Sequence, residues 1–305
     1  MSGGDGNGWV VLPDGSRRWG RFGASGLLLY AAGGRGGGHV LLQHRAAWSH
    51  QGDTWGMPGG ARDSGETSVE AALREFGEEV AGDLGPVILN GIHRLDHVVW
   101  SYDTVLARLP ERRPFAPGNA ESTAIRWVAL EEVASLPLLP AFGTMWPRLR
   151  AALAERLVLV VDATGSATHA PNGQDGAAGD AATAAGARRL RDDLAALAAV
   201  GLAGAELPAG AAGSALHRWF PAVRLVVPAT AGTGTVRPVG EAARGPGVEV
   251  VPAVGGPGAT VLELLARRRP GDRVLVVADD PEVAGRAAAA GANVAPLSWL
   301  PRRVA

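Results

Sequence analysis

The sequence predicts two consecutive α/β domains, the first with a mixed sheet and the second with a mostly parallel, doubly wound sheet. Its 305 residues exceed what one hydrophobic core usually organises. The first half alternates extended apolar runs with turn residues around a few helical segments, whereas strands and helices alternate regularly from Leu157 onward. We therefore expect domains at 1–156 and 157–305.

Each element of the first domain follows from a local pattern of apolar residues. A helix begins after Thr67, between the apolar runs on either side. We expect strands at 24–32 and 39–46, one or two strands within 93–109, a strand running into a short helix over 124–136, and a long helix over 142–156.

The second domain repeats a strand–helix alternation. We expect strands within 156–165, 223–230, 248–254 and 273–280, helices within 187–201, 260–269 and 281–291, and a polar, glycine-rich loop over 166–180. Repeated alternation of this kind is typical of a parallel sheet covered by helices.

Composition narrows the function classes. The formal net charge of −1 gives no global attraction to nucleic acid or to a membrane surface, so any polyanion site must be local. There is no Cys, which excludes disulfides and thiolate metal sites. No apolar stretch reaches membrane-spanning length, and the first residues lack a signal-peptide pattern. We expect a cytoplasmic protein; the sequence leaves its oligomeric state open.

The segment 59–82 crowds glutamates onto one short helix. Thr67 and Glu70 fit a capping box that starts the helix. The helical period predicts an apolar stripe of Val69, Ala72, Phe76 and Val80, with Glu75, Glu78 and Glu79 sharing another face. Like charges at these spacings cost roughly 0.2–0.5 kcal/mol per pair in an isolated helix. Either this is a solvated acidic face, or the three carboxylates hold a divalent cation.

The same segment resembles the signature of the Nudix hydrolases. Gly60, Glu66, Arg74, Glu75, Phe76, Glu78 and Glu79 occupy the specified positions of that signature. Two positions depart from it, because Ala81 stands where the family has Gly and Gly82 where it has an apolar residue. We interpret Gly82 as a left-handed cap that ends the helix one residue late. The resemblance extends over roughly residues 8–155 and implies a Nudix-type α/β/α sandwich with a mixed sheet.

The resemblance implies divalent-metal-dependent hydrolysis of the pyrophosphate linkage in a nucleoside diphosphate derivative or in a nucleoside triphosphate, oxidised or not. Oxidised nucleoside triphosphates, dinucleoside polyphosphates, nucleotide sugars and capped RNA are all left open as substrates. Such chemistry needs a cation that neutralises phosphate oxygens and generates hydroxide near neutral pH. By motif position, Glu75, Glu78 and Glu79 ligate Mg²⁺, with Mn²⁺ as the alternative and the carbonyl of Gly59 or Gly60 as a further ligand. Arg74 orients a neighbouring glutamate. Glu66 braces the preceding loop.

Other candidates lie outside the motif. Glu121 stands where a later loop of the family supplies a general base, with a surface glutamate as the alternative. Arg45, at a strand end, is a candidate phosphate clamp. Trp48, Trp55, Trp100 and Tyr102 are candidates for stacking on a base, with ordinary core or rim packing as the alternative for each. The expected partner is therefore a nucleotide or a nucleotide derivative.

Three acidic residues mark the second domain. Asp162, Asp279 and Asp280 follow apolar strands, and ligands of parallel sheets bind beyond the carboxyl ends of strands. The domain resembles a PIN-like, NYN-type nuclease, but the Asn expected after Asp162 is absent, and Gly258 and Ala259 stand where the family tends to have acids. We expect a degenerate domain, which leaves nucleic-acid binding through it open.

Two functions remain compatible with the sequence. One is a Nudix pyrophosphohydrolase; the other is a nucleotide or RNA sensor that binds without turnover and carries a C-terminal interaction module. The retained Arg74–Glu75 and Glu78–Glu79 pairs favour the enzyme, since a binder gains little from carboxylates that repel one another.

Overall fold

The computed structural model describes residues 4–33, 37–164, 177–211, 213, 216–229, 234–236 and 247–300, with the backbone alone at 177–184 and 234–236. Most of the loop expected over 166–180 lies outside the described residues; α3 (Ala177–Val200) already includes its last four positions. The chain divides into two compact units, Met1–Leu153 with Ser214–His217, and Ala154–Gly213 with Arg218–Ala305.

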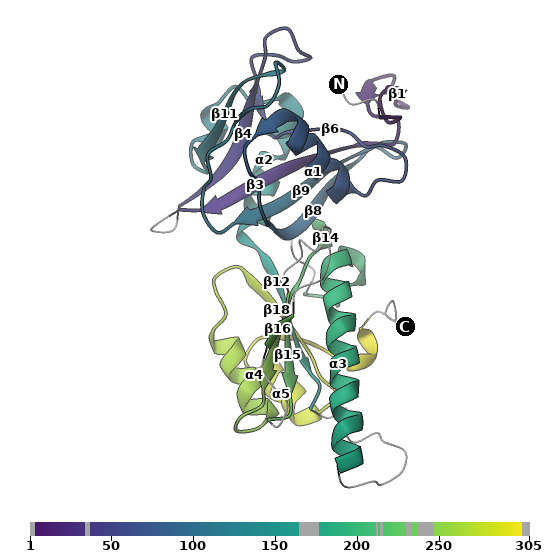
Figure 1. The fold of residues 1–305 in the computed structure, drawn as a ribbon, viewed down its shortest axis with the longest axis vertical. Coiled ribbons are helices and arrows are strands. Elements are labelled where there is room, and N and C mark those ends of the chain that lie inside the picture. The colour runs from purple at the N-terminus through teal and green to yellow at the C-terminus, as the bar shows by residue number, and fades with distance from the viewer. Residues whose placement is uncertain are drawn as a thin grey trace. The chain divides into compact units, whose positions relative to one another are not determined.

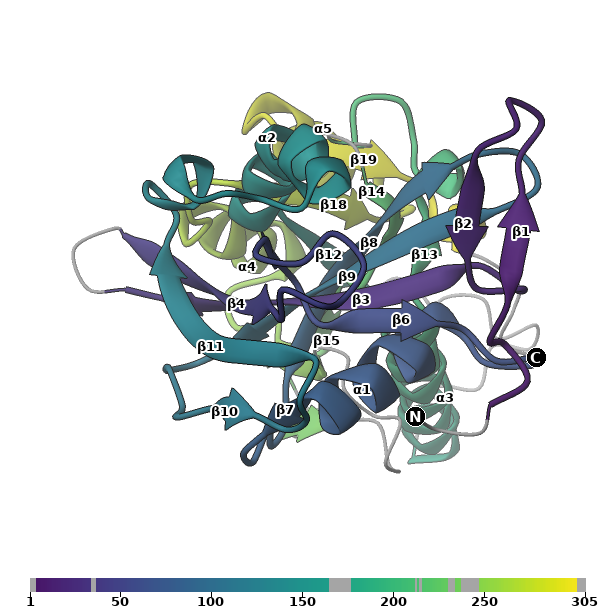
Figure 2. The same ribbon diagram turned by 90° about the horizontal axis from the view of Figure 1, so that it is seen from above.

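The first unit is built on a mixed sheet between two helices, as the sequence predicts. The sheet contains, in spatial order, β11 (Ser122–Ala129), β4 (Gly38–Arg45), β3 (Ala24–Ala32), β9 (Ser101–Leu109) and β8 (Ile88–Asp96). The β3–β9 pair is parallel, whereas β4 pairs antiparallel with both β3 and β11, and β8 with β9. Figure 2 shows α1 (Ser68–Glu79) and α2 (Pro140–Ala154) on opposite faces, which confirms the α/β/α sandwich.

The short helix expected at the end of 124–136 is the 3₁₀ turn η2 (Val133–Ser135). Several short strands escaped the sequence patterns. They are β1 (Trp9–Val11), β2 (Arg17–Trp19), β5 (Trp55–Gly56), β6 (Gly59–Ala61), β7 (Val80–Ala81) and β10 (Ala116–Pro117). β1 and β2 form a separate hairpin, β5 pairs with β4, and β6 pairs with β3. Segments of two or three residues are too short to establish an alternation of apolar and polar positions.

The start of α1 agrees with the predicted capping box. The amide of Glu70 donates to Oγ1 of Thr67 over 3.2 Å, and the amide of Thr67 donates to the Glu70 carboxylate over 2.8 Å. The predicted apolar stripe is wrong in part, because Val69 is only half-buried and the buried face includes a glutamate. The buried positions are Ser68, Ala71, Ala72, Phe76 and Glu79. Glu79 therefore lies on the core side of the helix, apart from the more exposed Glu75 and Glu78.

The predicted left-handed cap at Gly82 is also wrong. The backbone is already extended at Val80, which pairs with Pro117 in the short β7–β10 ladder. The amide of Gly118 donates to the carbonyl of Glu79 over 2.8 Å and thereby satisfies an orphan carbonyl of the helix end. Gly82 has a φ of 134°, and a Cβ there would lie 2.7 Å from the Phe115 ring, so glycine serves a close approach.

A buried carboxylate fixes the start of α1 against the sheet. Asp103 in β9 is fully buried and accepts two 2.8 Å bonds from Arg94 in β8 and one from the Ser68 hydroxyl. The Ser25 hydroxyl of β3 donates to the carbonyls of Ser68 and Asp103. Burial alone would raise the pKa of Asp103, but the bonds from Arg94 and Ser68 hold that pKa below its usual value. This network ties α1 to three strands.

The second unit has the doubly wound sheet that the sequence predicts. Its spatial order is β16 (Gly234–Val236), β17 (Val248–Pro252), β15 (Ala222–Val227), β12 (Arg156–Asp162), β18 (Asp272–Val277) and β19 (Asn293–Ala295). Every neighbouring pair is parallel except β16–β17. Figure 1 shows α4 (Pro257–Ala266) and α5 (Pro281–Ala289) on one face and α3 on the other.

The remaining elements are short, and β14 (Leu216–Trp219) crosses the boundary between the two units after His217. β13 (Leu202–Ala203) pairs antiparallel with β14, and the 3₁₀ turns η4 (Gly204–Glu206) and η5 (Leu297–Trp299) lie in loops. In the described part of the chain, none of the helices has the length and apolar character needed to cross a membrane.

Candidate active site

Arg74 joins the helix α1 to the loop that precedes it. Its guanidinium makes two bonds to the Glu66 carboxylate, over 2.8 and 2.9 Å, and one of 2.8 Å to the carbonyl of Ala61. A planar fork of donors suits this bidentate contact. The bond from Arg74 lowers the pKa of Glu66, and the bond to Glu66 is the main cause that raises the pKa of Arg74. Glu66 thus fastens the loop 61–66 to the helix.

Glu75 lies between Arg74 and the backbone of Gly60. Its Oε1 accepts a 2.7 Å bond from Arg74, and the same nitrogen lies 3.4 Å from Oε1 of Glu78. A Cβ on Gly60 would lie 2.5 Å from Oε2 of Glu75, so only glycine leaves room for the carboxylate here. Burial, aided by the charges of Glu78 and Glu66, raises the pKa of Glu75 although Arg74 opposes the shift.

Glu79 is the buried carboxylate of the group. Its side chain is only 6% exposed, and Oε2 accepts a 2.8 Å bond from the amide of Gly59. Burial raises the pKa of Glu79 to about 7; the charges of Glu75 and Glu121 add to the shift, while the Gly59 amide and Arg45 oppose it. A carboxylic acid with such a pKa changes protonation near neutral pH.

The structure brings Arg45 and Glu121 to the same place. The loop 118–121 is fixed to the end of α1, because Gly118 donates to the carbonyl of Glu79 and the Asn119 side chain donates to that of Glu78. Ser122, the next residue, pairs with Arg45 across the β11–β4 ladder. The charge of Arg45 lowers the pKa of Glu79 and the charge of Glu121 raises it, which agrees with the nearness of both side chains to Glu79. Sequence reasoning missed Asn119, whose only signal is its place beside Glu121.

The donor set fits a hard divalent cation. Carboxylates and backbone carbonyls are the oxygen ligands that Mg²⁺ takes, and the absence of a side chain at Gly60 lets the Glu75 carboxylate lie against that backbone. Among the residues that the structure describes, no three His, Asp or Glu side chains are grouped closely enough to hold a metal. In this arrangement Arg74 supplies the positive charge that Glu75 and Glu78 contact.

Two of the candidate stacking residues, Trp55 and Tyr102, have protein neighbours. The Trp55 ring lies 4.9 Å from the His44 ring, and the Arg126 guanidinium lies 4.8 Å from the Trp55 ring centre. Tyr102 packs with the cluster of Leu12, Ala24 and Trp100. Its hydroxyl lies close to the backbone of Gly26 and Gly59, where a Cβ would come within 2.3 and 3.0 Å of the oxygen. Burial, followed by the charges of Glu79 and Glu75, raises the pKa of Tyr102. Tyr102 therefore lies close to the carboxylates, and stacking on a base stays a prediction for both residues.

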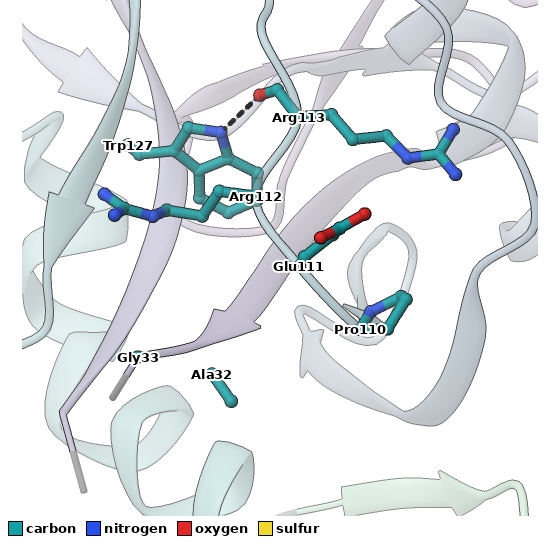
Figure 3. Close-up of a pocket in the computed structure, with 7 residues that line it drawn as sticks. All are labelled: Ala32, Gly33, Pro110, Glu111, Arg112, Arg113 and Trp127. Atoms are coloured by element: carbon teal, nitrogen blue, oxygen red, sulfur yellow. Dashed lines mark hydrogen bonds between the residues drawn. The ribbon is translucent and has the colours of Figure 1, made fainter. Parts of the chain in front are cut away.

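A pocket of about 440 Å³ lies apart from these residues, where β3 ends. Figure 3 shows its walls, which are Ala32, Gly33, Pro110, Glu111, Arg112, Arg113 and Trp127. The Trp127 indole donates to the carbonyl of Arg113 over 2.7 Å, and Arg113 contacts Asp83 over 3.2 Å. The pocket contains none of the residues that the sequence singled out. β3 begins at Ala24, beside Ala61 of β6, so the carboxylate group lies toward its other end.

The acids of the second unit accept hydrogen bonds from neighbouring groups, Asp162 and Asp280 within their own loops and Asp279 from the turn after β19. Asp162 accepts from the amide and the hydroxyl of Thr164, over 2.9 and 2.6 Å. Asp279 accepts a 2.8 Å bond from the amide of Leu297. Asp280 caps α5 through the amides of Glu282 and Val283. Each carboxylate thus has a local structural role.

Comparison with known proteins gives consistent matches. The NUDIX domain family matches residues 21–149. A Mycobacterium tuberculosis protein named "Putative 8-oxo-dGTP diphosphatase 3" is 50% identical over 155 residues, which are 49% of this chain and 71% of the relative. A "Nucleoside triphosphate pyrophosphatase/Nudix hydrolase fusion protein" of Bifidobacterium longum is 43% identical over 49% of this chain and 32% of the relative. The crystal structure of RenU, a Nudix hydrolase from M. smegmatis, matches with 44% identity over 48% of this chain and 93% of that chain, at a TM-score of 0.44.

The raised pKa of Glu79 predicts a pH-dependent stability in the absence of metal. Between the unfolded pKa of 4.5 and the folded pKa of about 7, the folded protein binds more protons than the unfolded chain. Its free energy of unfolding should therefore fall, by up to about 3 kcal/mol, as the pH rises through this window. Urea unfolding in EDTA from pH 5 to pH 8 measures the effect. Glu79→Gln should show a smaller decline, because only the raised pKa of Glu75 then contributes, and the exposed control Glu132→Gln should keep the decline of the parent. Equal slopes in parent and Glu79→Gln would contradict the assignment.

Proposed function

The chain belongs to the Nudix family and is a Nudix pyrophosphohydrolase, and from this premise we propose that it acts on oxidised purine nucleoside triphosphates such as 8-oxo-dGTP. The substrate is proposed because the relative of that name is 50% identical over 71% of its length. The observation that carries the chemistry is the convergence of Glu75, Glu79, Arg45 and Glu121 around the end of one helix. The sensor alternative, which binds without turnover, is not retained.

We propose that Glu75, Glu78, Glu79 and the carbonyl of Gly60 hold Mg²⁺, with Mn²⁺ as a substitute. The bound metal would supply hydroxide near neutral pH and neutralise phosphate oxygens. The role of Arg74 is to orient Glu75 and Glu78, which it contacts at 2.7 and 3.4 Å. Glu66 in turn holds Arg74, so the loop and the carboxylates form one unit.

The other roles fall to residues around Glu79. Arg45 would bind a phosphate, because it offers a planar fork of donors and lies close enough to Glu79 for its charge to affect that carboxyl. Glu121 would accept the proton of the attacking water, and its loop is held by hydrogen bonds from Gly118 and Asn119 to the end of α1. Trp55 and Tyr102 are retained as candidate walls of the substrate site.

We propose that residues 1–156 form the catalytic domain and that residues 157–305 form a degenerate, PIN-like domain of the NYN type. The doubly wound sheet supports the second assignment. The hydrogen bonds of Asp162, Asp279 and Asp280 support the loss of nuclease activity, since each carboxylate accepts from a backbone amide of the protein itself.

The metal assignment predicts a loss of turnover without a loss of folding. Glu78→Gln keeps the size of the side chain and removes one charge and one good ligand. With Mg²⁺ and 8-oxo-dGTP, its kcat should fall by at least about 100-fold, because the metal contributes both the nucleophile and charge neutralisation. The exposed control Glu132→Gln should stay within about twofold of the parent. Parental turnover in Glu78→Gln would contradict the proposal, and a kcat/KM for 8-oxo-dGTP no higher than that for dGTP would refute the substrate.

The C-terminal assignment predicts inactivity toward RNA. The full chain with Mg²⁺ or Mn²⁺ should leave a single-stranded RNA intact, because the acids at the strand ends are engaged with local backbone groups. Asp162→Asn should leave nucleotide hydrolysis within about twofold of the parent. RNA cleavage that disappears in Asp162→Asn would show an active nuclease domain instead.

A further inference from the structure

Large aromatic side chains are exposed near the end of β4 that leads into the site. Trp9 of β1 is 46% exposed, Trp19 of β2 is 43% exposed, and Trp48 in the loop after β4 is 71% exposed. Single exposed apolar residues are common on protein surfaces, but several indole rings on neighbouring segments mark an interaction site. The Nudix motif uses none of these residues.

The loop that carries Trp48 is closed by hydrogen bonds between its own residues. Ser49 donates its amide and its hydroxyl to the carbonyl of Ala46, and the amide of Gly52 donates to the carbonyl of Ser49. The ends of the loop close on Arg45, which exchanges backbone bonds with Asp53 and Thr54. The exposed indole is thus presented by a preorganised loop, which lowers the entropy cost of binding.

The same loop connects the aromatic rings to the catalytic residues. The Trp9 ring lies 5.3 Å from the Trp19 ring and 6.2 Å from the His50 ring. The carbonyl of His50 accepts a 3.1 Å bond from the Arg45 side chain. The amide of Ala46 donates to the carbonyl of Glu121 over 2.8 Å. One continuous strip therefore leads from the β1–β2 hairpin through the loop 46–53 to Arg45 and Glu121.

The strip combines aromatic rings, which suit a planar base, with Arg side chains, which suit an anion. Arg17 stacks on the Trp9 ring at 4.9 Å, and Arg45 lies at the other end of the strip. Trp48 makes no ring or cation–π contact within the described part of the chain, so both faces of its indole lack an aromatic neighbour there. Aromatic rings bind nucleobases by stacking, and Arg binds phosphate oxygens.

We propose that Trp48, together with Trp9, is the stacking wall for the nucleobase of the substrate, whose phosphates lie beside Arg45. The inference rests on the proposed function, since it assigns the base subsite of the same active site. Stacking on these rings contributes to nucleotide binding and leaves the phosphate chemistry to the carboxylates. Trp48 and Trp9 are thus residues that determine specificity for a base.

The test compares a ligand that has a base with one that lacks it. Dissociation constants for 8-oxo-dGTP and for inorganic tripolyphosphate are measured in EDTA, where no turnover occurs, on the full chain and on Trp48→Ala, Trp48→Phe and Trp9→Ala. Trp48→Ala and Trp9→Ala should each weaken 8-oxo-dGTP binding about tenfold and leave tripolyphosphate binding unchanged. Trp48→Phe should recover most of the loss. Ile88→Ala, which alters an exposed apolar residue outside the strip, should match the parent.

Kinetics separate this inference from the proposed function. With Mg²⁺, Trp48→Ala should raise KM for 8-oxo-dGTP about tenfold and leave kcat within about twofold. Unchanged nucleotide binding in both Trp→Ala variants would overturn the inference, as would an equal loss for tripolyphosphate, which would show that the loop only positions Arg45. Absence of hydrolysis by the parent would refute the proposed function, while the dissociation constants would still decide the stacking wall. Thermal melts check that each variant is folded. If Trp48→Ala is not folded, binding by Trp48→Phe and Trp9→Ala decides whether the rings stack on the base.

Discussion

The geometry of the site follows from the burial of one glutamate beside others at the end of α1. Glu79 lies on the core side of the helix, where water cannot stabilise its charge and Glu75 and Glu121 oppose it. Arg74 offsets the repulsion between Glu75 and Glu78 by pairing with both carboxylates. The Gly59 amide donates to Glu79, yet burial still raises the pKa of Glu79 to about 7. An arrangement that costs free energy in the absence of a cation is consistent with a role in binding one.

Much of the surrounding fold keeps this group in place. The capping box and the Asp103–Arg94 pair fix the first turn of α1, and the Arg74–Glu66 fork fixes the loop before it. At the other end, the amide of Gly118 donates to the carbonyl of Glu79, the last residue of α1, and the chain continues from Gly118 to Glu121. The site is therefore set by both ends of one helix, each held by hydrogen bonds to a different part of the sheet or its loops.

The sequence predicted the long elements and the motif, because both depend on local spacing. The strands around Leu28 and Leu41 and the cap at Thr67 follow from patterns within a few residues. The burial of Glu79 could not be predicted, since the helical period allows more than one buried face and the sheet decides which. The cap proposed at Gly82 failed because pairing of Val80 with Pro117, distant in sequence, ends the helix first. The strip of Trp9, His50 and Arg45 likewise joins segments that only tertiary structure brings together.

Binding of a divalent metal by the carboxylates of α1, which we propose, can be measured by calorimetric titration of Mg²⁺ at pH 6 in two buffers with different ionisation enthalpies. Metal ligands must be deprotonated, and Glu79, with a pKa of about 7, is mostly protonated at this pH. We expect release of about one proton per Mg²⁺ bound at pH 6, little release at pH 8, and loss of the release in Glu79→Gln. Mg²⁺ binding without proton release at pH 6, or no binding at either pH, would contradict the proposal.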